Sequence, residues 1–328
     1  KSSTIARNST TGYRHAAEEV PLMEDHDSAH ASIPELIPME VIADFTADWG
    51  EQLRGELAAA GYPVEAGEDP DRVSIKYFNI RSRLIPAQPR KVLVSHEFTC
   101  PPHLISVLES LKQKIAAGDD IAPHQSTRLL DAEFNDYLLN DWGIHHFHLS
   151  VEPHPKIAGF VARTGPLLFA RLTSDEAFLI DVVEHGGWSE QRLVTIMHSN
   201  WAESIEGYRL KDVKGVEMMP SDSEIGLLRK AGVNTTIEVA KGVVYAPPGG
   251  GYTTSRVAVN VVLAVNRYLA RVKKLEGYVR HNAEEIIEAI HSSGLETDSP
   301  PHFRLAIGKN GAYAVEIRSR AAFFVGEI

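Results

Sequence analysis

The chain has 328 residues, with 33 Lys and Arg against 44 Asp and Glu, a single cysteine and 43% hydrophobic residues. This length favours two domains, and the apolar fraction suffices for a sizeable core. A lone Cys100 excludes an internal disulfide and a metal site made of cysteines alone, and it indicates a reducing, cytoplasmic setting. No apolar run approaches the roughly 20 residues of a membrane helix, so no membrane partner is expected.

The charge is distributed unevenly along the chain. The formal net charge is −11, but residues 1–70 contain 14 acidic and 4 basic side chains, a balance of −10. The remaining 258 residues therefore have a balance of −1. Because the acidity is local, it does not exclude a polyanionic partner for the rest of the chain.

Residues 1–35 are rich in Ser, Thr, Asp, Glu and His and have few apolar side chains, which predicts a flexible acidic tail. Hydrophobic spacing then predicts a helix over residues 39–60. An alternating pattern over residues 74–83 predicts a strand that forms a hairpin with a second strand over residues 91–95. Two further helices are expected over residues 101–114 and 126–139.

The rest of the chain mixes hairpins with helices. A strand over residues 144–150 precedes a hairpin of residues 166–172 and 177–183 and a helix over 189–201. The last third is predicted to contain helices over 223–231, 254–271 and 283–292, with hairpins of 235–239 with 243–246 and 303–307 with 312–317. This order indicates an α+β fold, with mixed and antiparallel sheets built from hairpins and flanked by helices. The expected divisions are the tail 1–35, an α+β domain 36–205 and a smaller α+β domain 206–328.

The strand predicted over residues 144–150 (IHHFHLS) contains three histidines. Side chains alternate between the faces of a strand, so His146 and His148 share one face and His145 lies on the other. Two imidazoles at positions i and i+2 suit the acid and base of a phosphodiester cleavage, or two ligands of a divalent metal. A metal needs a third ligand, for which His154, Asp181 and His185 are candidates. The alternative is that these histidines satisfy backbone groups at a strand edge.

A second group of polar residues, Arg163, Arg171, Asp181 and His185, lies on or beside the hairpin predicted over residues 166–183. The guanidinium group of Arg171 offers paired donors for the charge that develops on a phosphate. Trp188 follows two glycines and offers a plane on which a base can stack. The alternative is a solvated strand face with one salt bridge and a core tryptophan.

The segment PLLFARLTSDEAFLIDVVEHGGW, residues 166–188, preceded by the strand IHHFHL, resembles the central sheet of the RelE/ParE superfamily of toxin–antitoxin toxins. The resemblance covers residues 144–201. It implies an endoribonuclease site built from Arg, Lys, His or Tyr side chains, with His185 after the last strand and Arg171 on the preceding one. It also implies an antitoxin or other protein partner. These toxins are short and strongly basic, whereas this chain is long and nearly neutral beyond its acidic start.

A glycine-rich loop, PPGGGYTTSR at residues 247–256, precedes the helix predicted over 254–271. Free N–H groups and the helix dipole at such a position bind anions, so Gly249, Gly250 and Gly251 are candidate phosphate contacts. The loop lacks the Gly-Lys-Ser/Thr ending of a P-loop, which argues against nucleotide hydrolysis there.

The helix after this loop is basic. Residues 256–280 contain six basic side chains and one acid, Glu276. Arg256, Arg267 and Arg271 are therefore predicted to follow a phosphate backbone. The alternative is a solvated helix face.

These features predict a nucleic-acid-directed protein, an RNA-binding endoribonuclease of toxin or antiviral-defence type that uses no cofactor. His146 or His148 would remove the proton of the attacking 2′-hydroxyl, His185 would protonate the leaving oxygen, and Arg171 would hold the developing charge. One alternative is a non-enzymatic adaptor or regulator that binds protein or nucleic acid. The other is a metal-dependent phosphoesterase that uses His146, His148 and Asp181.

Overall fold

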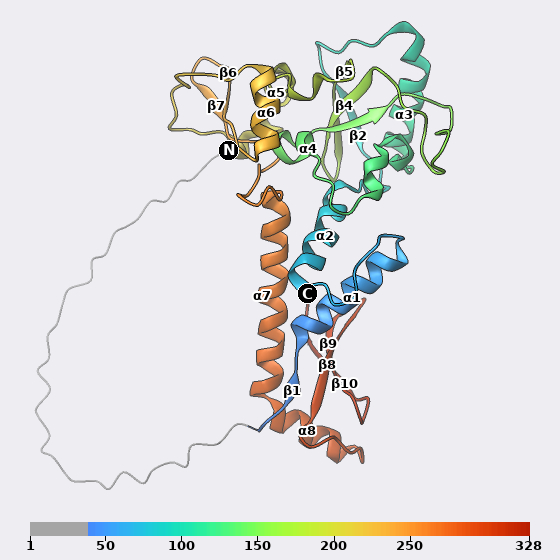
Figure 1. Cartoon of the computed structure of the whole chain (residues 1–328), viewed down its shortest axis with the longest axis vertical. Helices are drawn as coiled ribbons and strands as arrows, with labels where there is room; N and C mark the ends of the chain where they lie inside the picture. The colour runs from blue at the N-terminus through green and yellow to red at the C-terminus, as the bar shows by residue number, and fades with distance from the viewer. Residues whose placement is uncertain (1–38) are drawn as a thin grey trace, which may run out of the picture. The chain divides into compact units, whose positions relative to one another are not determined.

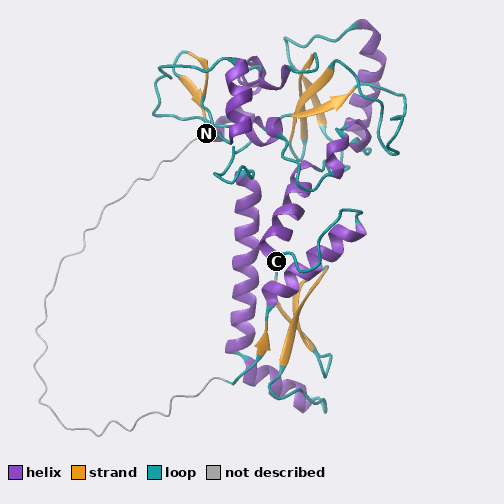
Figure 2. Cartoon of the chain, in the orientation of Figure 1, coloured by secondary structure: helices purple, strands orange, loops and turns teal. Residues whose placement is uncertain are grey.

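A computed structural model describes residues 39–328 of the chain. Helices and three separate sheets interleave along these residues, so the predicted α+β class is confirmed (Figures 1 and 2). The flexible tail predicted over residues 1–35 lies outside the described residues. Within residues 39–328, no helix combines the length and the apolar character that a membrane crossing requires.

The central sheet contains, in spatial order, β2 (Lys91–Val94), β5 (Glu176–Val183), β4 (Leu167–Leu172) and β3 (His145–His148). β2 runs parallel to β5, whereas β4 is antiparallel to both β5 and β3. The β4–β5 hairpin was predicted from its turn residues and is confirmed. A register shift between Phe169 and Ala170 interrupts the pairing of these two strands. The extra residue lies on β5, between Leu179 and Asp181, so the alternation of β4 continues unbroken to Arg171.

Both faces of the central sheet are covered, which explains the almost continuous apolar runs LLFA and AFLI in its two inner strands. Helix α3 (Ile105–Ala117) covers one face, where Leu111 packs with Leu168 and Leu179. The core on the opposite face of the sheet contains Phe169 together with residues of three helices and of one two-stranded hairpin. These elements are α4 (Tyr137–Trp142), α5 (Arg192–Trp201), α6 (Asp222–Ala231), β6 (Ile237–Ala240) and β7 (Val243–Tyr245).

The second four-stranded sheet joins the start and the end of the described chain. Its strands are β1 (Ile42–Ala43), β8 (His302–Gly308), β9 (Gly311–Glu316) and β10 (Ala322–Gly326). The helices packed around it are α1 (Phe45–Ala59), α2 (Pro70–Arg83), α7 (Val259–His281) and α8 (Ala283–Ser292). One hydrophobic core contains residues 41–80 together with residues 258–314, so packing crosses the division predicted at residues 205/206.

The strand predicted over residues 74–83 is wrong, because these residues belong to helix α2. Asp69 caps this helix by accepting a hydrogen bond from the backbone N–H of Asp71 at 2.8 Å, and Pro70 occupies its first turn. Val73 and Ile80 are buried seven residues apart, which is a helical rather than a strand spacing. The predicted hairpin with residues 91–95 is therefore also wrong, since β2 pairs in parallel with β5.

Two further helix predictions differ from the structure. Residues 126–139 form a short 3₁₀ turn (Thr127–Leu130) followed by the start of α4, rather than one helix. Asp136 ends the connection by accepting a hydrogen bond from the N–H of Leu139 at 3.1 Å, which caps α4. Helix α7 continues to His281, well beyond the predicted end at residue 271, because buried Val272, Leu275 and Val279 extend its apolar face.

Candidate functional site

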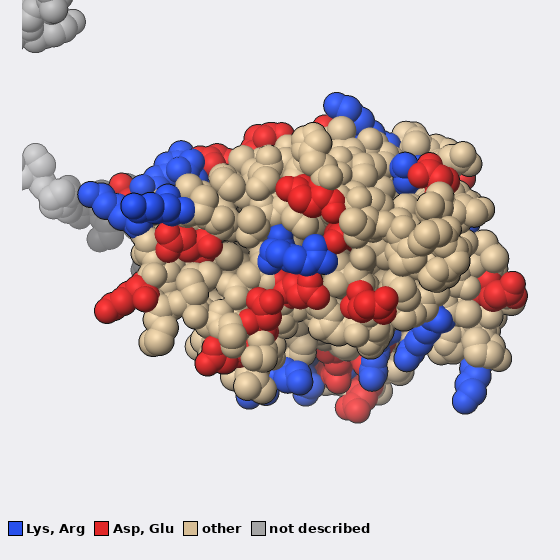
Figure 3. Space-filling model, turned by 90° about the horizontal axis from the view of Figure 1, so that it is seen from above, with Lys and Arg blue, Asp and Glu red and all other residues tan. Residues whose placement is uncertain are grey.

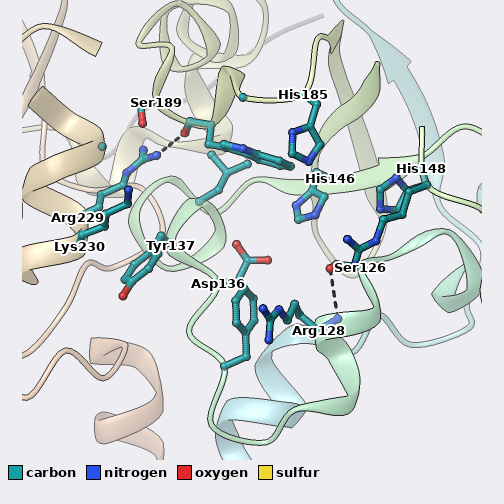
Figure 4. A pocket seen from close by; sticks show the side chains of 16 residues that line it. Ser126, Arg128, Asp136, Tyr137, His146, His148, His185, Ser189, Arg229 and Lys230 are labelled. Carbon is teal, nitrogen blue, oxygen red and sulfur yellow. Dashed lines mark hydrogen bonds between the residues drawn. The ribbon is translucent and has the colours of Figure 1, made fainter. Parts of the chain in front are cut away.

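Strand β3 presents His146 and His148 to the same side, as its alternation predicts. Their ring centroids lie 6.4 Å apart. Both line a cavity of about 500 Å³, which we call the histidine pocket. His185, in the loop after β5, lines the same pocket (Figure 4). The structure therefore brings together the three imidazoles predicted to act on a substrate.

The other walls of the histidine pocket are basic and aromatic. Figure 4 shows the three imidazoles near one another, with Arg229 and Lys230 at the other side of the pocket and Asp136 and Arg128 below. The basic residues of the lining are Arg128, Arg163, Arg229 and Lys230, and the aromatic ones are Phe134, Tyr137 and Trp188. A pocket of this composition suits a ligand that has both an anionic group and a flat ring.

Trp188 lies between the histidines and the core of the sheet. Its ring contacts His146 and His185 edge-on, with centroids 4.6 and 5.2 Å apart, and it packs against Phe169 at 5.6 Å. The Trp188 carbonyl accepts a hydrogen bond from Nη1 of Arg229. The predicted stacking residue thus belongs to the pocket, and both its ring and its backbone are held in place.

Arg229 is anchored by a buried ion pair. Its Nε lies 2.6 Å from Oδ2 of Asp141, and the two side chains are only 3% and 2% exposed. Its guanidinium group also lies over the ring of Trp142, 3.9 Å from the centroid. Sequence reasoning missed this pair because 88 residues separate Asp141 from Arg229 and neither residue lies in a motif.

The environment of the histidines favours their neutral form. Burial lowers the pKa of His148 to about 4, and the nearby charges of His146 and Arg163 act in the same direction. Burial likewise lowers the pKa of His146, against the opposing influence of the Asp136 carboxylate. A histidine that is neutral near pH 7 can accept a proton, although a pKa of about 4 makes His148 a weaker base than an ordinary imidazole.

Arg171 does not line the histidine pocket, so its predicted contact with His146, His148 and His185 is not formed. It lies two residues beyond Phe169, which pairs with His146, and this offset amounts to about 7 Å along the strand. There its Nη1 donates to the carbonyl oxygen of Pro248 at 3.4 Å. Arg163, close to His148, takes the place beside the histidines that was predicted for Arg171.

The glycine-rich loop does not offer the free N–H groups predicted for anion binding. The N–H of Gly249 donates to Asp141, that of Gly250 to Pro247 and that of Gly251 to Asn140, each to a backbone carbonyl at 2.8 or 2.9 Å. A side chain at residue 249 would collide with the carbonyl oxygens of Leu139 and Asn140. The glycines therefore allow the loop to pack closely against the end of α4.

The alternative metal set of His146, His148 and Asp181 is not assembled. Asp181 accepts hydrogen bonds from the N–H of Thr99 at 2.8 Å and from Nη1 of Arg192 at 2.7 Å, and it is absent from the lining of the histidine pocket. Across residues 39–328, His, Cys, Asp and Glu side chains do not gather in groups of three or more suited to a metal ion. These residues therefore do not fit the predicted metal centre.

The basic residues of α7 are separate from the histidine pocket. Arg267 and Arg271 are exposed on the helix. Arg280 instead donates hydrogen bonds to the carbonyls of Val41 and Ala43, at and beside β1. Arg256 lies in the preceding loop at a φ of 65°. On the face of the molecule shown in Figure 3, basic and acidic side chains lie among one another. Any nucleic-acid contact of α7 would thus form a surface distinct from the histidine pocket.

The resemblance to RelE/ParE toxins rests on the sequence pattern of residues 144–201, whose strands now form part of the central sheet. Comparison of the chain with protein-family models, curated proteins and solved structures gives no match.

Proposed function

We propose that the histidine pocket binds a phosphodiester of single-stranded RNA and cleaves it, so that the protein is an endoribonuclease of toxin or antiviral-defence type. The observation that supports this proposal is the grouping of His146, His148 and His185 in one cavity of about 500 Å³. Basic and aromatic side chains complete the lining, and both kinds of group are used to hold nucleic acid.

The proposed reaction is an internal transesterification. His146 or His148, neutral because burial lowers the pKa of each, accepts the proton of the 2′-hydroxyl as its oxygen attacks the phosphorus. The bond from phosphorus to the 5′-oxygen breaks, and His185 at the exposed rim donates a proton to that oxygen. The products are a 2′,3′-cyclic phosphate and a free 5′-hydroxyl, and the reaction needs no cofactor.

Arg163 is the residue best placed to hold the phosphate charge in this mechanism. It is exposed at the pocket, and its charge contributes to the lowered pKa of His148. Arg128 and Lys230 add positive charge to the same lining. Guanidinium groups offer paired donors to phosphate oxygens, so these residues supply the function first expected of Arg171.

Cleavage of a short 5′-labelled single-stranded RNA tests the proposal. His146→Ala and His148→Ala are each expected to lower the cleavage rate by about 10²- to 10⁴-fold, the usual contribution of a general acid or base. The matched control is His103→Ala, an exposed histidine outside the pocket, which should cleave as the wild type does. A DNA strand of the same sequence should stay intact because it has no 2′-hydroxyl.

Two outcomes would refute the proposal. Undiminished cleavage by the His146→Ala/His148→Ala double variant would show that the reaction occurs elsewhere. RNA binding in the pocket without cleavage by the wild type would favour the non-enzymatic alternative. Product analysis adds a third check, since a 3′-hydroxyl end would exclude attack by the 2′-oxygen.

A further inference from the structure

A second cavity, of about 240 Å³, lies where β3 begins and β4 ends. We call it the Arg171 pocket, and its polar lining includes Arg171, His145, Tyr208 and Asn260. We propose that it binds a phosphate group, either as the free ion or as a small phosphate ester. This inference does not depend on the reaction proposed for the histidine pocket, which has a separate lining.

The first argument is an arginine without a counter-ion. Nε of Arg171 is buried and has no hydrogen-bond partner within residues 39–328, and the bond from Nη1 to Pro248 is long at 3.4 Å. In the described part of the chain, no Asp or Glu lines this cavity. Burial lowers the pKa of Arg171, and Tyr208, not a carboxylate, is the neighbour that favours its charged form. Arg171 as a whole is partly buried, and a charge that is withdrawn from water is costly unless it is paired, so this guanidinium group is suited to receive an anion.

Arg229 shows how the same molecule treats an arginine that has a structural function. That guanidinium group has a carboxylate partner, Asp141, at 2.6 Å and an aromatic ring beneath it. Arg171 has no carboxylate in its cavity lining, its bond to the Pro248 carbonyl is long at 3.4 Å, and its other polar neighbour is Tyr208. Each arginine leaves one buried nitrogen without a hydrogen-bond partner in the described residues, Nη2 in Arg229 and Nε in Arg171, so what distinguishes Arg171 is the missing carboxylate.

The backbone around Arg171 is shaped to leave room for the guanidinium group. Gly143 ends α4 with a φ of 68°, and a side chain there would collide with Nη1 of Arg171. Helix α7 starts at Val259, after an alanine that supplies no side-chain cap, and Asn260 of its first turn lines the cavity. The positive end of this long helix dipole adds to the charge of Arg171 and favours an anion further.

Cavity size and donor type point to phosphate. A volume of about 240 Å³ is below the roughly 300–1,000 Å³ of pockets for larger ligands, so the occupant is small. Arginine presents a fork of donors that matches two oxygens of a phosphate group. His145 supplies a second group that becomes a cation when protonated. Burial and the charge of Arg171 both lower the pKa of His145, to about 4, and a bound dianion would raise it.

Titration with inorganic phosphate tests the inference on the full chain. We expect phosphate to raise the melting temperature and to move the NMR titration of the His145 imidazole to higher pH. Arg171→Gln should weaken phosphate binding about ten- to a hundredfold, as expected when charge-assisted hydrogen bonds are lost. Arg72→Gln, which changes an exposed arginine outside both pockets, is the matched control and should keep both effects.

Two further measurements distinguish a phosphate ester from the free ion and test the inference with a second variant. Tighter binding of glycerol phosphate than of inorganic phosphate would assign the pocket to an ester, and the reverse order would assign it to the free ion. Asn260→Asp places a carboxylate in the cavity in exchange for the amide that donates to the Gly249 carbonyl at 2.7 Å, and it should abolish the response even if Arg171→Gln does not fold. The inference fails if the wild type does not bind phosphate, or if Arg171→Gln binds it as tightly as Arg72→Gln does.

Discussion

Replacement of Arg229 by methionine removes the guanidinium group that holds Asp141, Trp142 and the Trp188 carbonyl together. Methionine has a similar length but no charge, so the Asp141 carboxylate would be left buried, 2% exposed and without its counter-ion. Breaking a buried ion pair from one side costs about 3–5 kcal/mol in the free energy of unfolding. Because Trp188 lines the histidine pocket, binding of any ligand there should weaken as well.

The double variant Asp141→Leu/Arg229→Met separates the value of the pair from the cost of an orphaned charge. It should be more stable than Arg229→Met alone, since it contains no buried charge. A residual loss of about 1–3 kcal/mol is expected because the Trp188 carbonyl loses its donor. Lys112→Met is the matched control: its pair with Glu109, at 2.8 Å, is solvent-exposed and should contribute less than about 1 kcal/mol.

Urea unfolding followed by tryptophan fluorescence measures these differences, with the slope m showing whether the unfolding transition stays comparable between variants. A loss below about 1 kcal/mol in Arg229→Met would refute the reasoning, because an exposed pair would explain it equally well. A double variant that is less stable than Arg229→Met would show that loss of the ion pair itself, and not the unpaired Asp141 carboxylate, causes most of the loss in the free energy of unfolding.

Three further predictions concern pH, close packing and nucleic-acid binding. Because the pKa of folded His148 is about 4 and that of an unfolded histidine roughly 6.5, the unfolded state binds more protons between these values. Lowering the pH from 7 to 5 should therefore reduce the free energy of unfolding by about 2 kcal/mol through this residue. In urea titrations at several pH values, His148→Gln should make the free energy of unfolding depend less on pH. Gly249→Ala should destabilise the protein by more than about 2 kcal/mol, because the added methyl group would collide with backbone carbonyls. Gly277→Ala, on α7 with open space around it, should stabilise the protein by up to about 1 kcal/mol. Equal melting temperatures of the two variants would contradict this. If α7 contacts RNA, replacing Arg267, Arg271 and Lys274 by glutamine should reduce the salt slope of binding by about 2, and an unchanged slope would exclude that contact.

Local signals predicted the elements that depend on neighbouring residues. The turn residues between β4 and β5 and the apolar spacing of residues 39–60 both predict elements that the structure confirms, the β4–β5 hairpin and helix α1. Helix α2 differs from the strand predicted by the alternation of residues 74–83 because Asp69 and Pro70 start a helix just before them. The parallel partner of β2 could not be predicted, since strand pairing over 85 residues depends on packing rather than on local pattern.

In the candidate site, too, local sequence pattern predicts some residues, whereas only the tertiary structure brings in others. His146 and His148 share a face because strand alternation is local, and His185 follows the next hairpin closely. Arg171 obeys the same alternation but lies one strand repeat further along, where α4 and the glycine-rich loop form a different cavity. Asp136 and Lys230 come from other elements and have no motif, so only tertiary structure could add them to the histidine pocket.

The pairing of β1 with β8 has a consequence for how the chain acquires its fold during synthesis. The core around α1 and α2 is completed by α7, α8 and β8, which lie roughly 200 residues later in the chain. At about 5–20 residues per second, a ribosome needs roughly 10 to 40 s to supply them. For that time the apolar faces of α1 and α2 lack their final partners. The central sheet can form sooner, since all four of its strands lie within residues 91–183. A growing chain is thus expected to present a folded sheet beside an unfinished helical core, the kind of intermediate that chaperones bind.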